Sequence, residues 1–87
     1  MATKTFRIGE CAVGGIIKVT TSNDEIIVKT IDWETKDELS TYKVNPKKMD
    51  ARYDMLNVLN EITTHYFSEQ ILEWVETQIT FKTEFTW

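Results

Sequence analysis

Polar and apolar residues alternate along the first half of the chain, which is the period of a β-strand with one buried face. Thr5–Ile8 shows this alternation, and the β-branched run Ile16–Thr21 is typical of a second strand. The longest alternation spans Glu25–Trp33, and Glu38–Val44 predicts a weaker fourth strand. Within the third segment one face carries Ile26, Val28 and Thr30, and the other carries Ile27, Lys29 and Ile31. Short polar turns separate the last three segments, which predicts an antiparallel meander.

Apolar spacing changes to three or four residues in the second half, which is the period of a helix with one buried stripe. Asn45-Pro46 ends the predicted sheet and suits the start of a helix. The stripe runs through Met55, Leu56, Leu59, Ile62 and Tyr66, then through Ile71, Leu72, Trp74 and Val75. Ser68 resembles a second cap, and the poor helix formers of Ile62–His65 indicate a break. We therefore expect one bent helix or two abutting helices over about residues 48–77.

The segment Thr80–Trp87 alternates again and predicts a terminal strand that rejoins the sheet beside an early strand. No linker, repeat or low-complexity segment divides the chain, and 87 residues support one core but not two. The predicted fold class is α+β, with residues 1–87 as a single domain. It combines an antiparallel β-meander of about four strands, one bent or two short helices packed on one face, and the C-terminal strand.

Composition narrows the classes of partner. The chain is 41% hydrophobic and 28% charged, which gives enough apolar area for a folded core. Its formal net charge of −4 makes direct nucleic-acid binding unfavourable, because such binding depends on Lys and Arg side chains that displace counterions. Two alternatives stay open, namely a local basic patch formed by Lys47, Lys48 and Arg52, and a basic protein partner.

The single cysteine, Cys11, excludes an intramolecular disulfide, and the first residues do not resemble a signal peptide. No apolar run approaches the roughly 18 residues that a membrane span needs. These features predict a cytoplasmic protein without a membrane partner.

Three features carry conceivable chemistry, and each has a structural interpretation that we favour. His65 has no Cys or His companion at metal-ligand spacing, so we expect a surface or half-buried helix residue. Cys11 follows Glu10, whose charge opposes a reactive thiolate. Gly14-Gly15 precedes a strand instead of a helix, which predicts a tight bend or close backbone approach and not a phosphate loop. We therefore expect no catalytic residue, no metal, no cofactor and no enzymatic activity.

One turn is a candidate for protein contact. The predicted hairpin beside Trp33 is crowded with carboxylates, namely Asp32, Glu34, Asp37 and Glu38. Such a turn has two interpretations. It is either a solvated turn that keeps an edge strand from aggregating, or an acidic contact patch with an aromatic anchor. The last residue, Trp87, either packs on the sheet or meets a partner, whereas Trp74 lies in the helical stripe and is expected in the core.

Two resemblances point towards bacteriophage. The opening Lys4–Glu10 (KTFRIGE) and the following Val13–Val19 (VGGIIKV) resemble small uncharacterised proteins of tailed bacteriophages. Similarity extends through Ile31-Asp32-Trp33 with Thr35-Lys36, through Leu59–Thr64, and to a terminal aromatic near Trp87, and so covers nearly the whole chain. That family has no assigned activity that the resemblance could imply.

The second resemblance is weaker and is to the type II-C anti-CRISPR family that blocks an HNH nuclease domain. It rests on the chain's length, a late helix and a few short segments. These segments are Met1-Ala2, Lys4-Thr5, Ile8-Gly9, Glu25–Lys29 and Glu84-Phe85. The middle third departs from that family, which has an Asp-rich, Cys-containing loop and a Trp-bearing helix where this chain has a hairpin. None of the family's nuclease-contacting residues is carried over.

The leading hypothesis is therefore a non-enzymatic phage protein that acts in the cytoplasm of the host cell. It binds and inhibits or modulates a host protein, and a CRISPR nuclease is the sharpest candidate. The alternative is a small structural or assembly accessory of the virion, acting as a homo-oligomer such as a dimer formed through an exposed sheet edge. A third hypothesis, nucleic-acid binding, predicts salt-sensitive retention on DNA.

Overall fold

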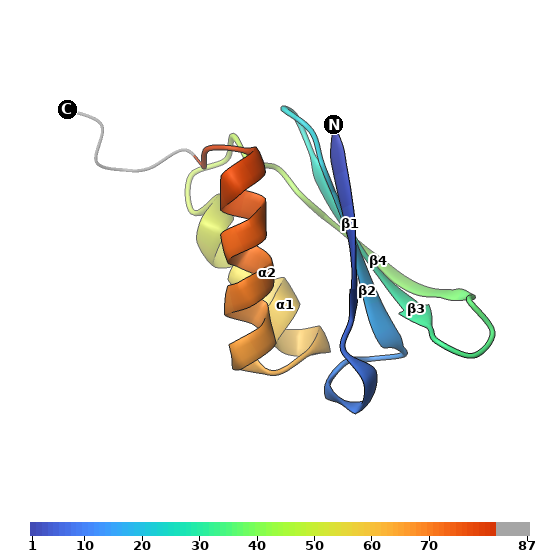
Figure 1. Ribbon diagram of the computed structural model, residues 1–87. Helices are drawn as coiled ribbons and strands as arrows, with labels where there is room; N and C mark the ends of the chain where they lie inside the picture. Colours follow the sequence, from blue (N-terminus) through green and yellow to red (C-terminus); the bar gives the residue numbers. More distant parts are fainter. Residues whose placement is uncertain (82–87) are drawn as a thin grey trace.

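Four antiparallel strands form an open sheet, and two helices pack against one of its faces (Figure 1). This computed structural model describes residues 1–81. The elements in chain order are β1 (Ala2–Arg7), a 3-10 turn η1 (Gly9–Cys11), β2 (Gly15–Thr21), β3 (Ile26–Asp32), β4 (Glu38–Val44), α1 (Ala51–Ile62) and α2 (His65–Gln78). The strands lie in the order β1-β2-β3-β4, so the predicted α+β class and the meander are confirmed.

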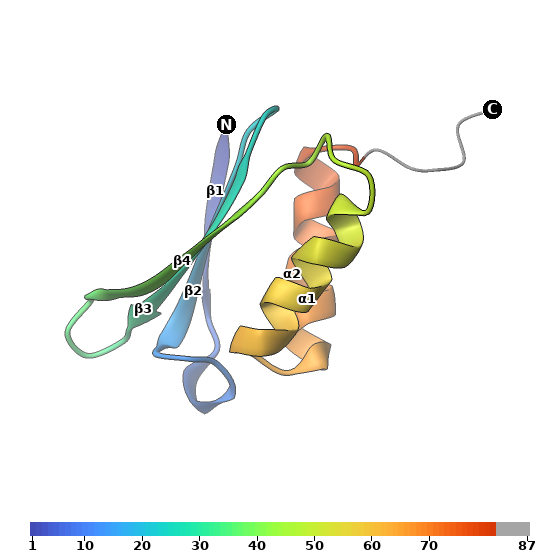
Figure 2. The same ribbon diagram turned by 180° about the vertical axis from the view of Figure 1, so that it is seen from behind.

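The hydrophobic core lies between the sheet and the helices, which Figure 2 shows from the opposite side. It comprises Ile17, Val19, Ile26, Val28 and Val44 from the sheet, Ala51, Met55, Leu59 and Ile62 from α1, Ile71, Leu72 and Val75 from α2, and Phe81. In β3 the face with Ile26, Val28 and Thr30 is the buried one of the two faces that the alternation defines. Burial of each large side chain stabilises the fold by about 1.5–3 kcal/mol.

Trp74 joins α2 to the edge strand β1. Its half-buried ring packs against the ring of Phe6, with 6.0 Å between centroids and an interplanar angle of 76°. Edge-to-face aromatic pairs of this kind add about 0.5–1.5 kcal/mol beyond their buried area. The expectation that Trp74 lies with the core is therefore confirmed.

The helical half consists of two helices and not one bent helix. The break falls at Thr63-Thr64, inside the predicted segment, where Thr63 is extended with φ −153° and ψ −179°. The Thr63 hydroxyl donates a hydrogen bond to the carbonyl of Cys11, and Thr63 also forms a β-bridge with Ala12. Neither helix in the described part of the chain is long and apolar enough to cross a bilayer.

Three local expectations about the helices are wrong. Asn45 does not cap a helix: its Oδ1 accepts the Lys47 N–H at 2.9 Å in a turn, and α1 begins later, after Asp50. Ser68 lies inside α2, where its hydroxyl donates to the Thr64 carbonyl at 3.0 Å. Tyr66 is exposed, because the break ends the helical phase of α1 before that position is reached.

The predicted C-terminal strand lies mainly outside the described residues. Thr80 and Phe81 are not part of a strand, although Phe81 is buried in the core. Residues 82–87 fall outside the described part of the chain, and Trp87 is among them.

The connection from β1 to β2 depends on glycine at position 14. Gly14 has a φ of +73°, and a Cβ placed on it would lie 2.7 Å from the Ile31 carbonyl oxygen and 2.6 Å from Leu39 Cδ1. A side chain at this position would therefore meet both a left-handed backbone and a neighbouring strand. This geometry agrees with the structural interpretation of the glycine pair.

We expect Gly14→Ala to lower the free energy of unfolding by about 2–4 kcal/mol, from the left-handed backbone together with overpacking. Gly9→Ala is a matched control, because Gly9 also has a positive φ of +65° but has no atom within 4 Å of the added Cβ. The free energy of unfolding of this control should fall by about 1–2 kcal/mol. Urea denaturation measures both, and equal losses would show that the contact with Ile31 does not matter.

Thr30 is the polar side chain at the centre of the core. It is fully buried, and its hydroxyl has no hydrogen-bond partner among the described residues 1–81. A buried hydroxyl without a partner lowers the stability of the fold.

We expect Thr30→Val to raise the free energy of unfolding by about 1 kcal/mol, because a methyl group replaces an unpaired hydroxyl of similar size. Thr41→Val is the control: Thr41 is exposed on the neighbouring strand, and the change there should be within about 0.5 kcal/mol. Thermal and urea denaturation give the comparison. A clear loss of stability in Thr30→Val would contradict the expectation.

Candidate interaction surface

The turn between β3 and β4 is held by hydrogen bonds within itself. Oδ1 of Asp32 accepts the backbone N–H groups of Glu34 at 2.8 Å and of Thr35 at 3.1 Å. Lys36, with a left-handed φ of 65°, donates its backbone N–H to the Asp32 carbonyl at 2.8 Å. Its ammonium also donates to the carbonyl of Trp33 at 2.7 Å. The tip therefore has one defined backbone conformation.

The carboxylate of Asp32 is the centre of this turn. The N–H groups of Thr35 and then Glu34 hold its pKa below the ordinary value of an aspartate, and the Lys36 charge acts in the same direction. Both hydrogen bonds favour the ionised form, since a protonated carboxyl is a poorer acceptor.

Because the folded-state pKa of Asp32 is lowered, its contribution to stability is present above the unfolded pKa and is lost as the pH falls through the folded pKa. We expect Asp32→Asn, which keeps an acceptor oxygen, to remove this part of the acid sensitivity between about pH 5 and about pH 2. Urea midpoints across this range measure it. Asp37→Asn is the control, because the Asp37 carboxylate accepts no backbone hydrogen bond from residues 1–81.

Trp33 stands at the base of this turn with its side chain 60% exposed. Its backbone N–H donates to the Gly14 carbonyl at 2.8 Å. Its ring lies against Gly15, where an added Cβ would be 3.1 Å from Trp33 Cδ1. The backbone of Trp33 is therefore held at Gly14, and its ring contacts Gly15 while the residue remains largely exposed.

The predicted acidic residues divide between the tip and the sheet. Glu34 and Asp37 are exposed beside Trp33, and neither forms an ion pair within the described part of the chain. Glu38 begins β4, where its Oε1 lies 3.0 Å from the Lys29 ammonium. The structure thus brings Trp33, Glu34 and Asp37 together and directs Glu38 to a different neighbour.

Two grooves border the indole of Trp33. The larger has a volume of 460 Å³ and is lined by Gly9, Glu10, Ala12, Gly14, Gly15, Asp32 and Trp33. The smaller has a volume of 200 Å³ and is lined by Arg7, Gly9, Gly15, Ile16, Trp33 and Lys36. Sequence reasoning missed Arg7, Ile16 and Lys36 here. The pairing register of β1, β2 and β3 places Arg7 and Ile16 beside Trp33, whereas Lys36 belongs to the same turn as Trp33.

The predicted basic patch does not present unpaired charges. Lys47 lies 2.6 Å from Asp24, Lys48 lies 3.6 Å from Asp54, and Arg52 lies 3.3 Å from Glu76. The Lys47 hydrogen bond, and then its charge, lowers the pKa of Asp24. These three cations are therefore matched with carboxylates of the same chain.

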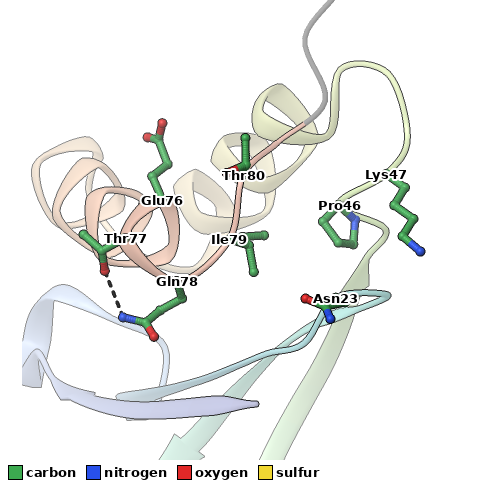
Figure 3. Close-up of a pocket in the computed structure, with 8 residues that line it drawn as sticks. All are labelled: Asn23, Pro46, Lys47, Glu76, Thr77, Gln78, Ile79 and Thr80. Atoms are coloured by element: carbon green, nitrogen blue, oxygen red, sulfur yellow. Dashed lines mark hydrogen bonds between the residues drawn. The ribbon is translucent and has the colours of Figure 1, made fainter.

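The groove in Figure 3 lies at the other end of the molecule, where α2 ends beside the β2–β3 turn and Pro46. It has a volume of 510 Å³ and a mixed polar and apolar lining. Its charged members, Lys47 and Glu76, are paired with Asp24 and Arg52. Its lining does not bring together an acid, a base and a nucleophile, so it is a weaker candidate than the Trp33 surface.

His65 and Cys11 are both exposed, as the sequence predicts for His65. Nε2 of His65 lies 3.0 Å from Glu69 Oε1, and Nδ1 lies 3.3 Å from Asn60 Oδ1, so both ring nitrogens have a polar neighbour on the helices. Within residues 1–81, no three His, Cys, Asp or Glu side chains are grouped so that they could hold a metal ion.

No protein-family model, curated protein or solved structure matches the chain.

Proposed function

We propose that the chain is a non-enzymatic binding domain that attaches to another protein through the surface around Trp33. The observation that carries this proposal is a largely exposed indole on a residue whose backbone N–H is bonded to the Gly14 carbonyl and whose ring lies against Gly15. Trp is enriched among residues that dominate binding energy at interfaces. A side chain that is already positioned loses less conformational freedom on binding.

The polar residues at the tip support the same function. Glu34 and Asp37 flank the indole without an ion pair in residues 1–81, so their charges are available to a partner. Charged groups around a central aromatic set orientation and association rate more than affinity. This tip would therefore select a partner with basic groups around an apolar pocket.

The partner that we propose to test first is a CRISPR nuclease of the host, and its HNH domain in particular. The resemblance of a few short segments of the chain, of its length and of its late helix to the type II-C anti-CRISPR family supports this choice. Binding that blocks the nuclease would make the chain an inhibitor without any chemistry of its own.

We expect Trp33→Ala to weaken binding to that partner by about 30-fold, or about 2 kcal/mol. Tyr53→Ala is the matched control, because Tyr53 is 65% exposed but lies on α1 in the other layer. Calorimetry with purified HNH domain gives the affinities, and capture from host lysate extends the search to other proteins. Melting curves check that both variants fold. Equal binding by wild type and Trp33→Ala would overturn the proposal.

A second function is favoured by one specific observation, the open edge of β1. Ala2–Arg7 pairs with β2 on one side, and no strand of residues 1–81 pairs with the other side. An open edge can pair with a second copy and form a homo-oligomeric accessory of a virion. Light scattering that shows a dimer or larger species, together with detection in purified particles, would favour this function.

A further inference from the structure

The face of the sheet that the helices do not cover is the strongest unassigned feature of the described chain. Figures 1 and 2 show α1 and α2 on the same side of the sheet, and the opposite side carries neither helix. We call this the outer face. By strand alternation and pairing register it carries Thr3, Thr5, Arg7, Ile16, Lys18, Thr20, Ile27, Lys29, Ile31, Glu38, Thr41 and Lys43. Antiparallel sheets often leave one face to water, so openness alone assigns nothing.

We propose that the outer face binds an acidic, amphipathic helix of the protein partner, with Trp33 at the edge of the contact. This inference rests on the proposed function and names the chemistry of a second segment of the partner, separate from the basic groups that would face Glu34 and Asp37. The charges of the outer face carry it. Of its four cations, Lys29 and Lys43 pair with Glu38 at 3.0 Å and Glu25 at 3.7 Å, whereas Arg7 and Lys18 have no carboxylate within 4.0 Å among residues 1–81.

The centre of the outer face places two lysines directly opposite each other. Lys18 of β2 and Lys29 of β3 are register partners, and like charges in such cross-strand positions destabilise a sheet. Glu38 compensates Lys29 at 3.0 Å, but Lys18 has no carboxylate within 4.0 Å among residues 1–81. A carboxylate of a bound segment would supply the missing ion-pair partner of Lys18.

Hydroxyl groups extend this central row. Thr5 lies beside Lys18 on β1, and Thr41 lies beside Lys29 on β4. The row therefore runs hydroxyl, ammonium, ammonium, hydroxyl across all four strands. Each of these groups can donate a hydrogen bond to a carboxylate.

The end of the outer face nearest the β3–β4 turn offers an apolar anchor. The 200 Å³ groove there has Ile16 and Trp33 in its lining, with the charged groups of Arg7 and Lys36 also on it. Arg7 has no carboxylate within 4.0 Å among residues 1–81. An apolar side chain next to an acidic one would fit both parts of this groove, and amphipathic helices present such neighbours.

Other occupants fit less well. Single-stranded nucleic acid needs successive aromatic platforms, whereas Trp33 is the one aromatic at this face among residues 1–81. A second copy would have to offer its helical layer. There Asp54, Glu69 and Glu76 are already paired with Lys48, His65 and Arg52, which leaves two exposed carboxylates, those of Glu61 and Glu73.

The first test uses a synthetic helical peptide of about twelve residues with Glu and Leu on opposite faces. Amide shifts of the ¹⁵N-labelled chain should move on β1 to β4 and at the Trp33 indole, and the affinity should fall as NaCl rises from about 50 to about 300 mM. Lys18→Glu should weaken binding at least about tenfold. The control Lys47→Glu makes the same change in net charge away from the outer face and should stay within about twofold.

Lys18→Thr should change the stability of the chain and its peptide binding in opposite directions. Because it relieves the repulsion with Lys29, it should raise the melting temperature while it weakens peptide binding. A residue with a purely structural role would not show this opposition. If Lys18→Thr lowers both stability and binding, the inference fails.

Four further outcomes would overturn the inference: shift changes confined to the helices, equal weakening by Lys47→Glu, tighter binding of an oligothymidylate of similar length, or displacement of the peptide by self-association.

Measurements with the captured partner separate this inference from the proposed function. Loss of binding with Trp33→Ala but not with Lys18→Glu would leave the proposed function standing and remove only the role of the outer face.

Discussion

The backbone of Ala12–Gly15 connects the sheet, the helices and the hairpin turn through hydrogen bonds. Val13 donates its N–H to the Ile62 carbonyl at the end of α1, and the Gly14 carbonyl accepts the Trp33 N–H at the end of β3. The carbonyl of Gly15 accepts the Ile8 N–H, which returns the chain from β1. Gly14 makes this connection sterically feasible, because any larger residue would contact the Ile31 carbonyl.

This junction also holds the backbone of Trp33, whose indole is exposed. Trp33 lies on the strand end that the junction holds, so its exposure does not come with freedom of the backbone. The Asp32 turn fixes the following residues in the same way. Binding would therefore cost less conformational entropy of the Trp33 backbone. This is the physical basis of the proposed protein contact.

The two layers of the molecule differ in charge. The helices carry five carboxylates and one arginine, whereas the outer face of the sheet carries four cations, of which Lys29 and Lys43 pair with Glu38 and Glu25. The net charge of −4 is a sum over these layers and so does not show the basic character of the outer face. A local basic patch at Lys47, Lys48 and Arg52 was an open alternative from the sequence, but carboxylates distant in sequence pair with two of those three residues.

The sequence by itself determined the first four strands, the division of β3 into two faces, the order of the meander and the segment in which the helices break. Each follows from local alternation, turn chemistry and the weak helix propensity of Ile62–His65. Asn45 and Ser68 were misjudged, because a capping residue is recognised only by the backbone around it, and both make other local hydrogen bonds. The tertiary structure alone decided the surroundings of Trp33 and the opposition of Lys18 and Lys29. Those depend on strand register and on the fold of the β1–β2 connection, which bring together residues far apart in the chain.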